Sequence, residues 1–131
     1  MKDKEKNELI KAWLSSSNED FETAKGLFDL KRYSGTLFFC HLSLEKILKA
    51  LFLKKNDNYP PPTHKLLRLA NLSKLEIDKE TQNYLAEITT FNIEARYDIL
   101  KERLYKKATK DYTKKYLEIT AKLINNFKKM L

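Results

Sequence analysis

Residues that break helices are almost absent from this sequence, and this scarcity constrains the fold more than any other feature. The 131 residues include two glycines and three prolines, and the prolines are consecutive, at positions 60–62. Long stretches without either residue favour a few long helices over many short strands. A chain of this length can close one hydrophobic core without disulfides or metals. We therefore expect a single all-α domain over residues 1–131, an up-and-down bundle of four main helices plus a short fifth helix.

Apolar side chains recur at three- and four-residue steps in several segments, which predicts amphipathic helices. The four predicted main helices cover about residues 6–31, 33–55, 78–96 and 111–130, and a short helix is expected at about residues 63–72. These helices should pack through their apolar faces around one core.

Three local signals affect the ends of these helices. Serines 15–17 and Asn18 are the weak point of the first helix, where the chain could bend or Asn18 could recap it. Thr63 and Asp78 are the expected N-caps of the short helix and of the helix after it. Residues 97–110 have no clear pattern, and we expect a long loop or a short extra turn there.

The predicted helix at residues 33–55 is apolar over much of its circumference. Its large apolar residues fall on more than one side at four-residue steps, including Leu44, Leu48 and Leu51 on one side and Phe38, Leu42 and Phe52 on another. A helix with several apolar sides has to be flanked on several sides. We therefore expect this helix to lie at the centre of the bundle.

His41, Glu45 and Lys49 form a polar stripe on this central helix. Each four-residue step turns the helix face by only about 40°, so the three side chains are neighbours. In one interpretation, Glu45 and Lys49 form a helix ion pair and His41 is a satisfied, half-buried residue. In the other, the stripe faces a groove or a second subunit, because charge on an apolar helix is costly to bury without a partner.

Two further polar groupings could bind an anion. His64 follows the three prolines at the start of the predicted short helix, whose N-terminus could receive an anion; alternatively, Thr63 caps that helix and His64 only packs. Arg96 lies between two acidic residues in the segment at 94–98. It could make a structural ion pair, or the carboxylates could hold it in position to face a phosphate.

The net charge of +8 is concentrated in the last quarter of the chain. Residues 101–131 carry 10 Lys or Arg and 3 Asp or Glu, a balance of +7, whereas residues 1–100 carry 16 and 15, a balance of +1. Positive charge mixed with tyrosines suits nucleic acid, through phosphate contacts and base stacking. Alternatively, the lysines form a solvated face while Tyr112 and Tyr116 pack in the core. The candidate contacts to nucleic acid are Lys106, Lys107, Lys110 and Lys114.

Several other classes of site have little support in the sequence. Cys40 is the single cysteine, and with two histidines it offers no metal-ligand spacing and no disulfide. Cys40 and His41 are adjacent on a helix, so their side chains point about 100° apart, which argues against a nucleophile pair. No glycine-rich phosphate loop, signal peptide or membrane span is apparent. We expect a cytoplasmic protein without a metal, a membrane contact or a cofactor other than a possible nucleotide.

Four short motifs follow one another along the chain: Arg32-Tyr33 at a turn, LSLEKILKAL at residues 42–51, PTHKL at residues 62–66 and ARY at residues 95–97. Their order and spacing resemble the HEPN domain family (higher eukaryotes and prokaryotes nucleotide-binding), over roughly residue 18 to the C-terminus. In the resemblance, the matching residues mark a polar groove or dimer seam. Together with His41, the candidate ligand-binding or interface residues are then Glu45, Lys46, Lys49, His64, Arg96 and Tyr97.

The resemblance implies four long helices with a short fifth helix, usually a homodimer, and frequent pairing with a minimal nucleotidyltransferase in prokaryotic operons, in some cases as toxin and antitoxin. Many active members are RNases with an arginine, four to six residues, and then a histidine. This sequence departs from that pattern, because no histidine follows His64 and eight residues separate Arg32 from His41. A metal-independent RNase needs a group to accept the 2′-hydroxyl proton. We therefore assign no catalytic residue, and a non-enzymatic role is favoured.

The leading hypothesis is a homodimeric helical module that binds a nucleotide, pairs with a minimal nucleotidyltransferase in a toxin–antitoxin type system, or does both. One alternative is an RNase toxin with a divergent active site, to which Arg96, His64 or His41 contributes. The other is a nucleic-acid-binding module that uses the basic C-terminal region.

Overall fold

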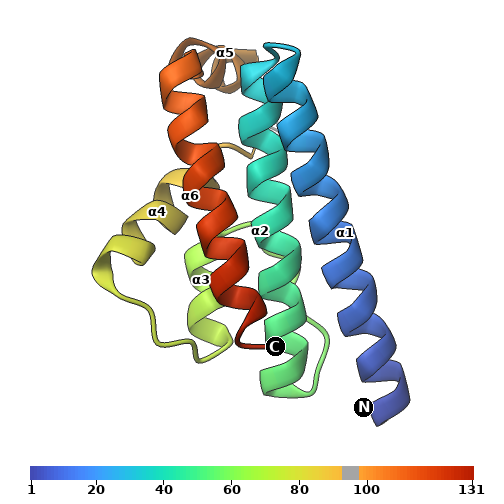
Figure 1. Cartoon of the computed structure of the whole chain (residues 1–131). Coiled ribbons are helices and arrows are strands. Elements are labelled where there is room, and N and C mark those ends of the chain that lie inside the picture. The colour runs from blue at the N-terminus through green and yellow to red at the C-terminus, as the bar shows by residue number, and fades with distance from the viewer. Residues whose placement is uncertain (93–97) are drawn as a thin grey trace.

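The computed structural model describes residues 1–92 and 98–131, and in this part of the chain six helices and no strands are present (Figure 1). The predicted all-α class is therefore confirmed. The six helices are α1 (Asp3–Asp29), α2 (Tyr33–Asn56), α3 (Leu66–Leu72), α4 (Lys79–Thr89), α5 (Asp98–Lys107) and α6 (Lys110–Lys128).

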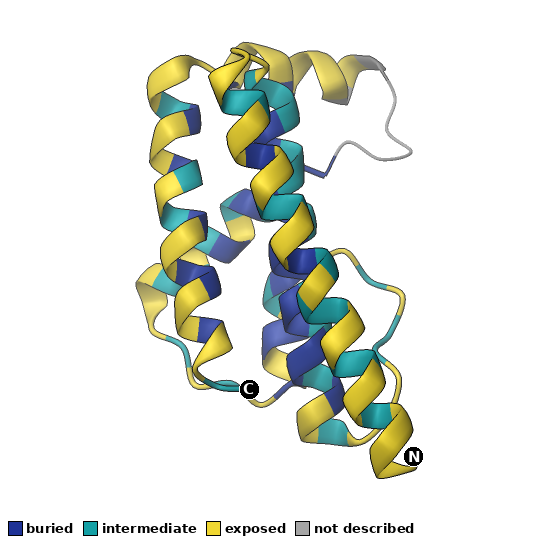
Figure 2. Ribbon diagram, turned by 45° about the vertical axis from the view of Figure 1, so that its right-hand side comes forward, coloured by how far each residue is buried: buried dark blue, intermediate teal, exposed yellow. Residues whose placement is uncertain are grey.

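The long helix α2 is the centre of the molecule, as its apolar circumference predicted. It packs against each of the other five helices, most extensively against α1 and α6. α1 runs antiparallel to α2, and α6 runs beside α2 in the same direction (Figure 1). Buried residues are frequent along α2 and recur along α6, whereas α1 is mostly exposed or intermediate and buries Ser17 and Ala24 (Figure 2). The largest fully buried side chains of α2 are Leu37, Leu44, Ile47, Leu48, Leu51 and Leu53.

α1 continues without a break through the serine run, so the alternative of a bend or a new cap at Asn18 was wrong. Ser17 is fully buried against α2, and its hydroxyl donates a hydrogen bond of 2.7 Å to the backbone oxygen of Ser43. A serine that finds a partner on the neighbouring helix need not compete with its own backbone. Ser17 therefore fastens α1 to α2.

The short helix α3 begins at Leu66, three residues later than the sequence predicted. Thr63 does not cap it, and its hydroxyl instead accepts from the backbone N–H of Lys65 at 3.2 Å. The first N–H of the helix, at Leu66, donates to the Thr89 hydroxyl of α4 at 3.2 Å. A partner on another helix thus replaces the local cap. The other predicted cap is confirmed, because Asp78 accepts from the backbone N–H of Thr81 at 2.8 Å.

α4 ends at Thr89 and not near residue 96, and the predicted residues 93–96 lie outside the described part of the chain. The chain leaves the helix because Phe91 turns into the core, where it is fully buried and packs edge-on against Tyr116. The expected loop or short turn at residues 97–110 was also wrong over residues 98–107, which form α5. Leu104 and Ala108, one turn apart, are buried and anchor this lysine-rich segment to the core.

The connection between α2 and α3 runs back alongside α2. α2 ends at Asn56, and its C-cap residue Asp57 has a left-handed φ of 51°. The chain then turns upward along the side of α2 before it enters α3 (Figure 1). This path brings the Pro-Pro-Pro-Thr-His segment beside the polar stripe of α2. In the described residues, no helix is both long and apolar enough to cross a membrane.

Candidate functional site

Glu45 is the centre of the polar stripe on α2. The residue is 5% exposed, and its two carboxylate oxygens have different partners. Oε2 accepts a hydrogen bond from Lys49 Nζ at 2.8 Å, and Oε1 accepts one from Nδ1 of His64 at 2.7 Å. Burial by itself would raise the pKa of this carboxyl group, but the hydrogen bonds from Lys49 and His64 outweigh it and lower the pKa below the ordinary value. Glu45 is therefore an ionised group inside a mostly apolar helix.

His41 lies one turn before Glu45 and is fully buried. Its Nε2 lies 2.9 Å from the backbone oxygen of His64 and 3.8 Å from Glu45 Oε1. Because a carbonyl oxygen only accepts, Nε2 carries the hydrogen, and the buried Nδ1 has no partner among the described atoms. Burial lowers the pKa of His41 against the opposing effects of the His64 carbonyl and the Glu45 charge. His41 is thus a neutral donor that holds the connection between α2 and α3.

His64 is the most accessible member of this group. Its side chain is 53% exposed, while its Nδ1 donates to Glu45 and its backbone oxygen accepts from His41. The two imidazole rings lie 6.4 Å apart between centroids and are tilted by 52°. We call His41, Glu45, Lys49 and His64 the Glu45 cluster. It fixes the connection at two points and leaves the outer side of the His64 ring accessible to solvent.

The structure brings four of the predicted site residues together and places a fifth elsewhere. The ammonium group of Lys49 also lies over the ring of Trp13 on α1, 5.3 Å from its centroid, which is a cation–π contact. Lys46 does not join the Glu45 cluster, because it pairs with Asp20 of α1 at 2.5 Å. The remaining two residues of the predicted groove or seam, Arg96 and Tyr97, lie outside the described residues.

A second polar cluster is built around Glu87 on α4. Its Oε2 pairs with Lys107 Nζ at 2.7 Å and accepts a hydrogen bond from the Tyr112 hydroxyl. Lys107 Nζ also lies 6.0 Å from the ring centroid of Phe91 and 5.6 Å from that of Tyr112. Burial and the Glu87 carboxylate raise the pKa of Tyr112. Lys107, a candidate contact to nucleic acid, therefore has an intramolecular partner, and Tyr112 packs against the core together with Tyr116, as one interpretation expected.

The other candidate lysines are exposed. Lys106 pairs with Glu102 at 3.3 Å in an ion pair that is exposed at both ends. Lys110 and Lys114 are exposed at the start of α6, and neither is paired with a carboxylate in the described part of the chain. All three remain available to a polyanion. Whether they contact nucleic acid stays a prediction.

Three partners in these clusters were missed from the sequence: Trp13, Asp20 and Glu87. Each meets a lysine of a different helix. A spacing of three or four residues reveals a pair only within one helix. Trp13 and Asp20 are seven residues apart, which places both on the face of α1 that packs against α2. This spacing was the sequence signal that could have indicated their contacts with α2.

Neither metal chemistry nor thiol chemistry finds a site in the described residues. Among residues 1–92 and 98–131, no three His, Cys, Asp or Glu side chains come close enough together to hold a metal ion. Cys40 is fully buried, and burial raises the pKa of its thiol to about 12, so that it stays protonated at neutral pH.

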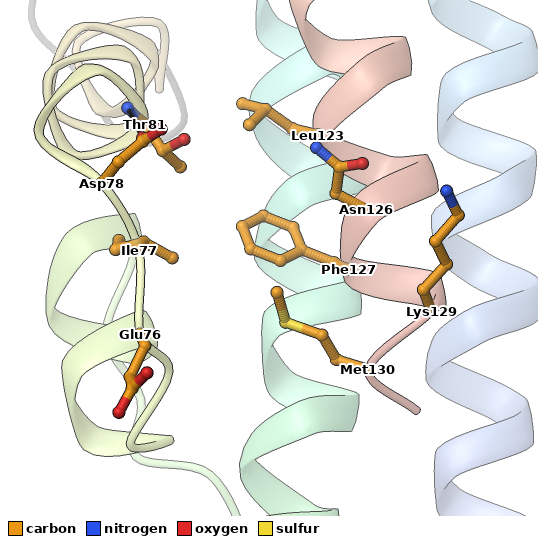
Figure 3. Close-up of a pocket in the computed structure, with 9 residues that line it drawn as sticks. All are labelled: Glu76, Ile77, Asp78, Thr81, Leu123, Asn126, Phe127, Lys129 and Met130. Atoms are coloured by element: carbon orange, nitrogen blue, oxygen red, sulfur yellow. Dashed lines mark hydrogen bonds between the residues drawn. The ribbon is translucent and has the colours of Figure 1, made fainter.

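A hollow of about 370 Å³ lies between the segment before α4 and the end of α6. Ile77 and Phe127 face each other across it (Figure 3). Asp78, at its edge, is already used as the N-cap of α4. This hollow therefore has little free polar chemistry with which to orient a ligand.

We expect Glu45→Gln to lower the free energy of unfolding at pH 7 by about 3 kcal/mol, because it leaves Lys49 without a counter-charge at a mostly buried site. The folded-state pKa of Glu45 lies below its unfolded value of 4.5. Its contribution is therefore present above pH 4.5 and is lost as the pH falls through the folded-state pKa. Urea unfolding of the wild type and the variant at neutral and acid pH measures this loss.

The matched control is Glu102→Gln, which removes a carboxylate from an exposed ion pair and should change the free energy of unfolding by less than about 0.5 kcal/mol. Equal stability of wild type and Glu45→Gln at pH 7, or a difference that persists undiminished in acid, would contradict the role assigned to Glu45.

Comparison with known proteins agrees with this architecture. The model of the HEPN domain family matches residues 10–130, nearly the whole chain. The crystal structure of TT1696 from Thermus thermophilus is similar in fold, with a TM-score of 0.76 and 18% sequence identity, and the match covers 93% of this chain and 98% of that chain. No curated protein sequence matches the chain. The family match extends through all six helices and both polar clusters, and the chain belongs to the HEPN domain family.

Proposed function

We propose that this protein is a homodimeric HEPN module that binds a nucleotide, pairs with a minimal nucleotidyltransferase as in toxin–antitoxin systems, or does both. The surface that we assign to this role surrounds His64. Family membership supports the class of module, and the geometry of the Glu45 cluster supports the position of the surface.

The observation that carries the proposal is the way His64 is held. Its Nδ1 is fixed by a carboxylate and its backbone oxygen by His41, while about half of its side chain faces solvent. In the described residues, no group is bonded to its Nε2. A ring whose rotamer is fixed loses little conformational entropy when it meets a ligand. His64 is therefore a preorganised contact for a phosphate, a base edge or a protein partner.

The rest of the Glu45 cluster favours binding over chemistry. His41 is buried and donates to a carbonyl, so it has no route for exchanging a proton with a ligand. Glu45 and Lys49 neutralise each other at 2.8 Å. Groups that are engaged in this way hold the shape of a site and do not react. Cytoplasmic localisation is part of the same proposal.

Light scattering should give a mass about twice the 15.5 kDa of one chain.

Calorimetry with ATP and GTP should give a dissociation constant below about 1 mM for one of them. His64→Ala should weaken nucleotide binding at least tenfold, about 1.4 kcal/mol, because a preorganised contact is lost. Lys55→Ala is the control. This exposed lysine lies in the last turn of α2, ten residues after Glu45 and outside the Glu45 cluster.

A monomer at all concentrations would contradict the dimer, and no heat at millimolar nucleotide would remove the nucleotide part. Co-purification with a minimal nucleotidyltransferase encoded beside this gene tests the partner part. His64→Ala should reduce that co-purification as well, and an undiminished yield would move the partner surface away from His64.

One observation favours a second candidate function, an RNase with a divergent site. The Glu45 carboxylate is bonded to Nδ1 of His64 at 2.7 Å, and in the described residues the opposite ring nitrogen has no partner. A carboxylate that orients a histidine in this way is the usual arrangement of a general base. His64 could then accept the 2′-hydroxyl proton, and Arg96 could stabilise the charge on the phosphate.

Incubation of the purified protein with RNA tests this second function. His64→Gln should lower the cleavage rate by about 100-fold or more, and Arg96→Ala should lower it as well. Cleavage that is absent in the wild type, or unchanged in His64→Gln, would rule out His64 as a general base. Equal cleavage by wild type and Arg96→Ala would remove the role of Arg96.

A further inference from the structure

A cleft at the end of the bundle opposite the two chain termini is not used by either polar cluster. It has a volume of about 430 Å³ and lies between the turn that joins α1 to α2 and the turn that joins α5 to α6. These two turns are far apart in sequence and meet at the same end of the molecule (Figure 1). A cleft of this volume falls in the size range of small-molecule sites, about 300–1,000 Å³.

The charge of this cleft is entirely positive. Lys31 and Arg32 line one side and Lys106 lines the other, and no carboxylate is among the lining residues. Lys31 and Arg32 are exposed, and neither pairs with a carboxylate in the described part of the chain. Lys106 has one weak partner, Glu102, in an exposed ion pair that water and salt screen. The cations are therefore available to an anionic ligand.

The tyrosines of the cleft differ in their surroundings. Tyr33 packs against Phe28 with ring centroids 5.5 Å apart and is half-buried. Tyr105 is 74% exposed, and no other described ring lies against it. An exposed aromatic face beside three cations is the combination that binds unpaired bases, because the base stacks while the phosphate is neutralised.

The positive charge continues beyond the cleft along α5 and the first turns of α6. Residues 98–115 contain seven Lys or Arg and three Asp or Glu. Lys101, Arg103 and Lys110 are all exposed in this segment. A free nucleotide would occupy only the cleft, whereas a strand would place further phosphates along these cations. The N-terminal end of α2, at this cleft, carries the positive end of the helix dipole. No acidic residue in its first turn offsets that charge.

We propose that this cleft binds one nucleotide of a single-stranded nucleic acid, with its phosphate held by Lys31, Arg32 and Lys106 and its base stacked on Tyr105. Single strands are favoured over duplexes because only an unpaired base can stack on a side chain in this way. This site is separate from the surface around His64 and does not depend on the function proposed there.

Fluorescence anisotropy with a labelled oligouridine of about ten nucleotides, and with the matching oligothymidine, tests this proposal. Arg32→Ala with Lys106→Ala should weaken binding about tenfold or more, and affinity should fall steeply as salt rises. Lys55→Ala with Lys122→Ala is the matched control, since it removes the same charge from exposed positions outside the cleft and should change affinity far less.

Tyr105→Ala should weaken binding about fivefold or more, and Tyr105→Phe should restore it, because stacking needs the ring and not the hydroxyl. Calorimetry of the Arg32→Ala, Lys106→Ala double variant with ATP and GTP should give the wild-type dissociation constant, so failure here is distinguishable from failure of the nucleotide or partner function. The proposal is overturned if the wild type does not bind at low salt, if both double variants lose affinity equally, or if Tyr105→Ala binds as the wild type does. If uridine monophosphate competes for the site as strongly as the unlabelled oligonucleotide does, the assignment to a strand is overturned.

Discussion

The ionised carboxylate of Glu45, almost completely buried on the central helix, is the constraint on which the candidate site around His64 depends. Such a group must be neutralised and hydrogen-bonded, because an unpaired buried charge is very costly. Lys49 supplies the charge from the same helix, and His64 supplies the second hydrogen bond from the connection to α3. The connection must therefore run back along α2. This path fixes where α3 begins and which side of the His64 ring meets solvent.

The molecule separates two kinds of polar surface. Around Glu45 the polar groups are bonded to one another, and the surface they leave is small and rigid. At the end of the bundle where α1 meets α2 and α5 meets α6, the cations line an open cleft without carboxylates. The first arrangement suits a defined contact with a nucleotide or a partner protein, and the second suits a flexible polyanion. Nearly all of the net charge of +8 belongs to the C-terminal segment that helps to build the second surface.

Features that reside within a single helix could be predicted from the sequence, and features that join helices could not. The central position of α2, the Glu45–Lys49 pair and the Asp78 cap follow from spacings of three or four residues. The hydrogen bond from His64 to Glu45 joins residues 19 positions apart, and no helical spacing predicts such a contact. α5 was missed because its charged sequence resembles a loop, and only two buried residues anchor it to the core. α4 ends earlier than predicted because Phe91 turns into the core. Arg96 and Tyr97 were predicted from a motif and remain predictions.

The protonation states of the two histidines test this account most directly, and ¹⁵N-resolved NMR of the imidazole rings measures them. We predict that the pKa of His41 lies below its ordinary value of 6.5, because burial lowers it, and that the neutral ring carries its hydrogen on Nε2. We also predict a hydrogen-bonded proton on Nδ1 of His64 that points to Glu45. A His41 that titrates near 6.5, or a neutral His64 with its hydrogen only on Nε2, would contradict the central place of Glu45 in this structure.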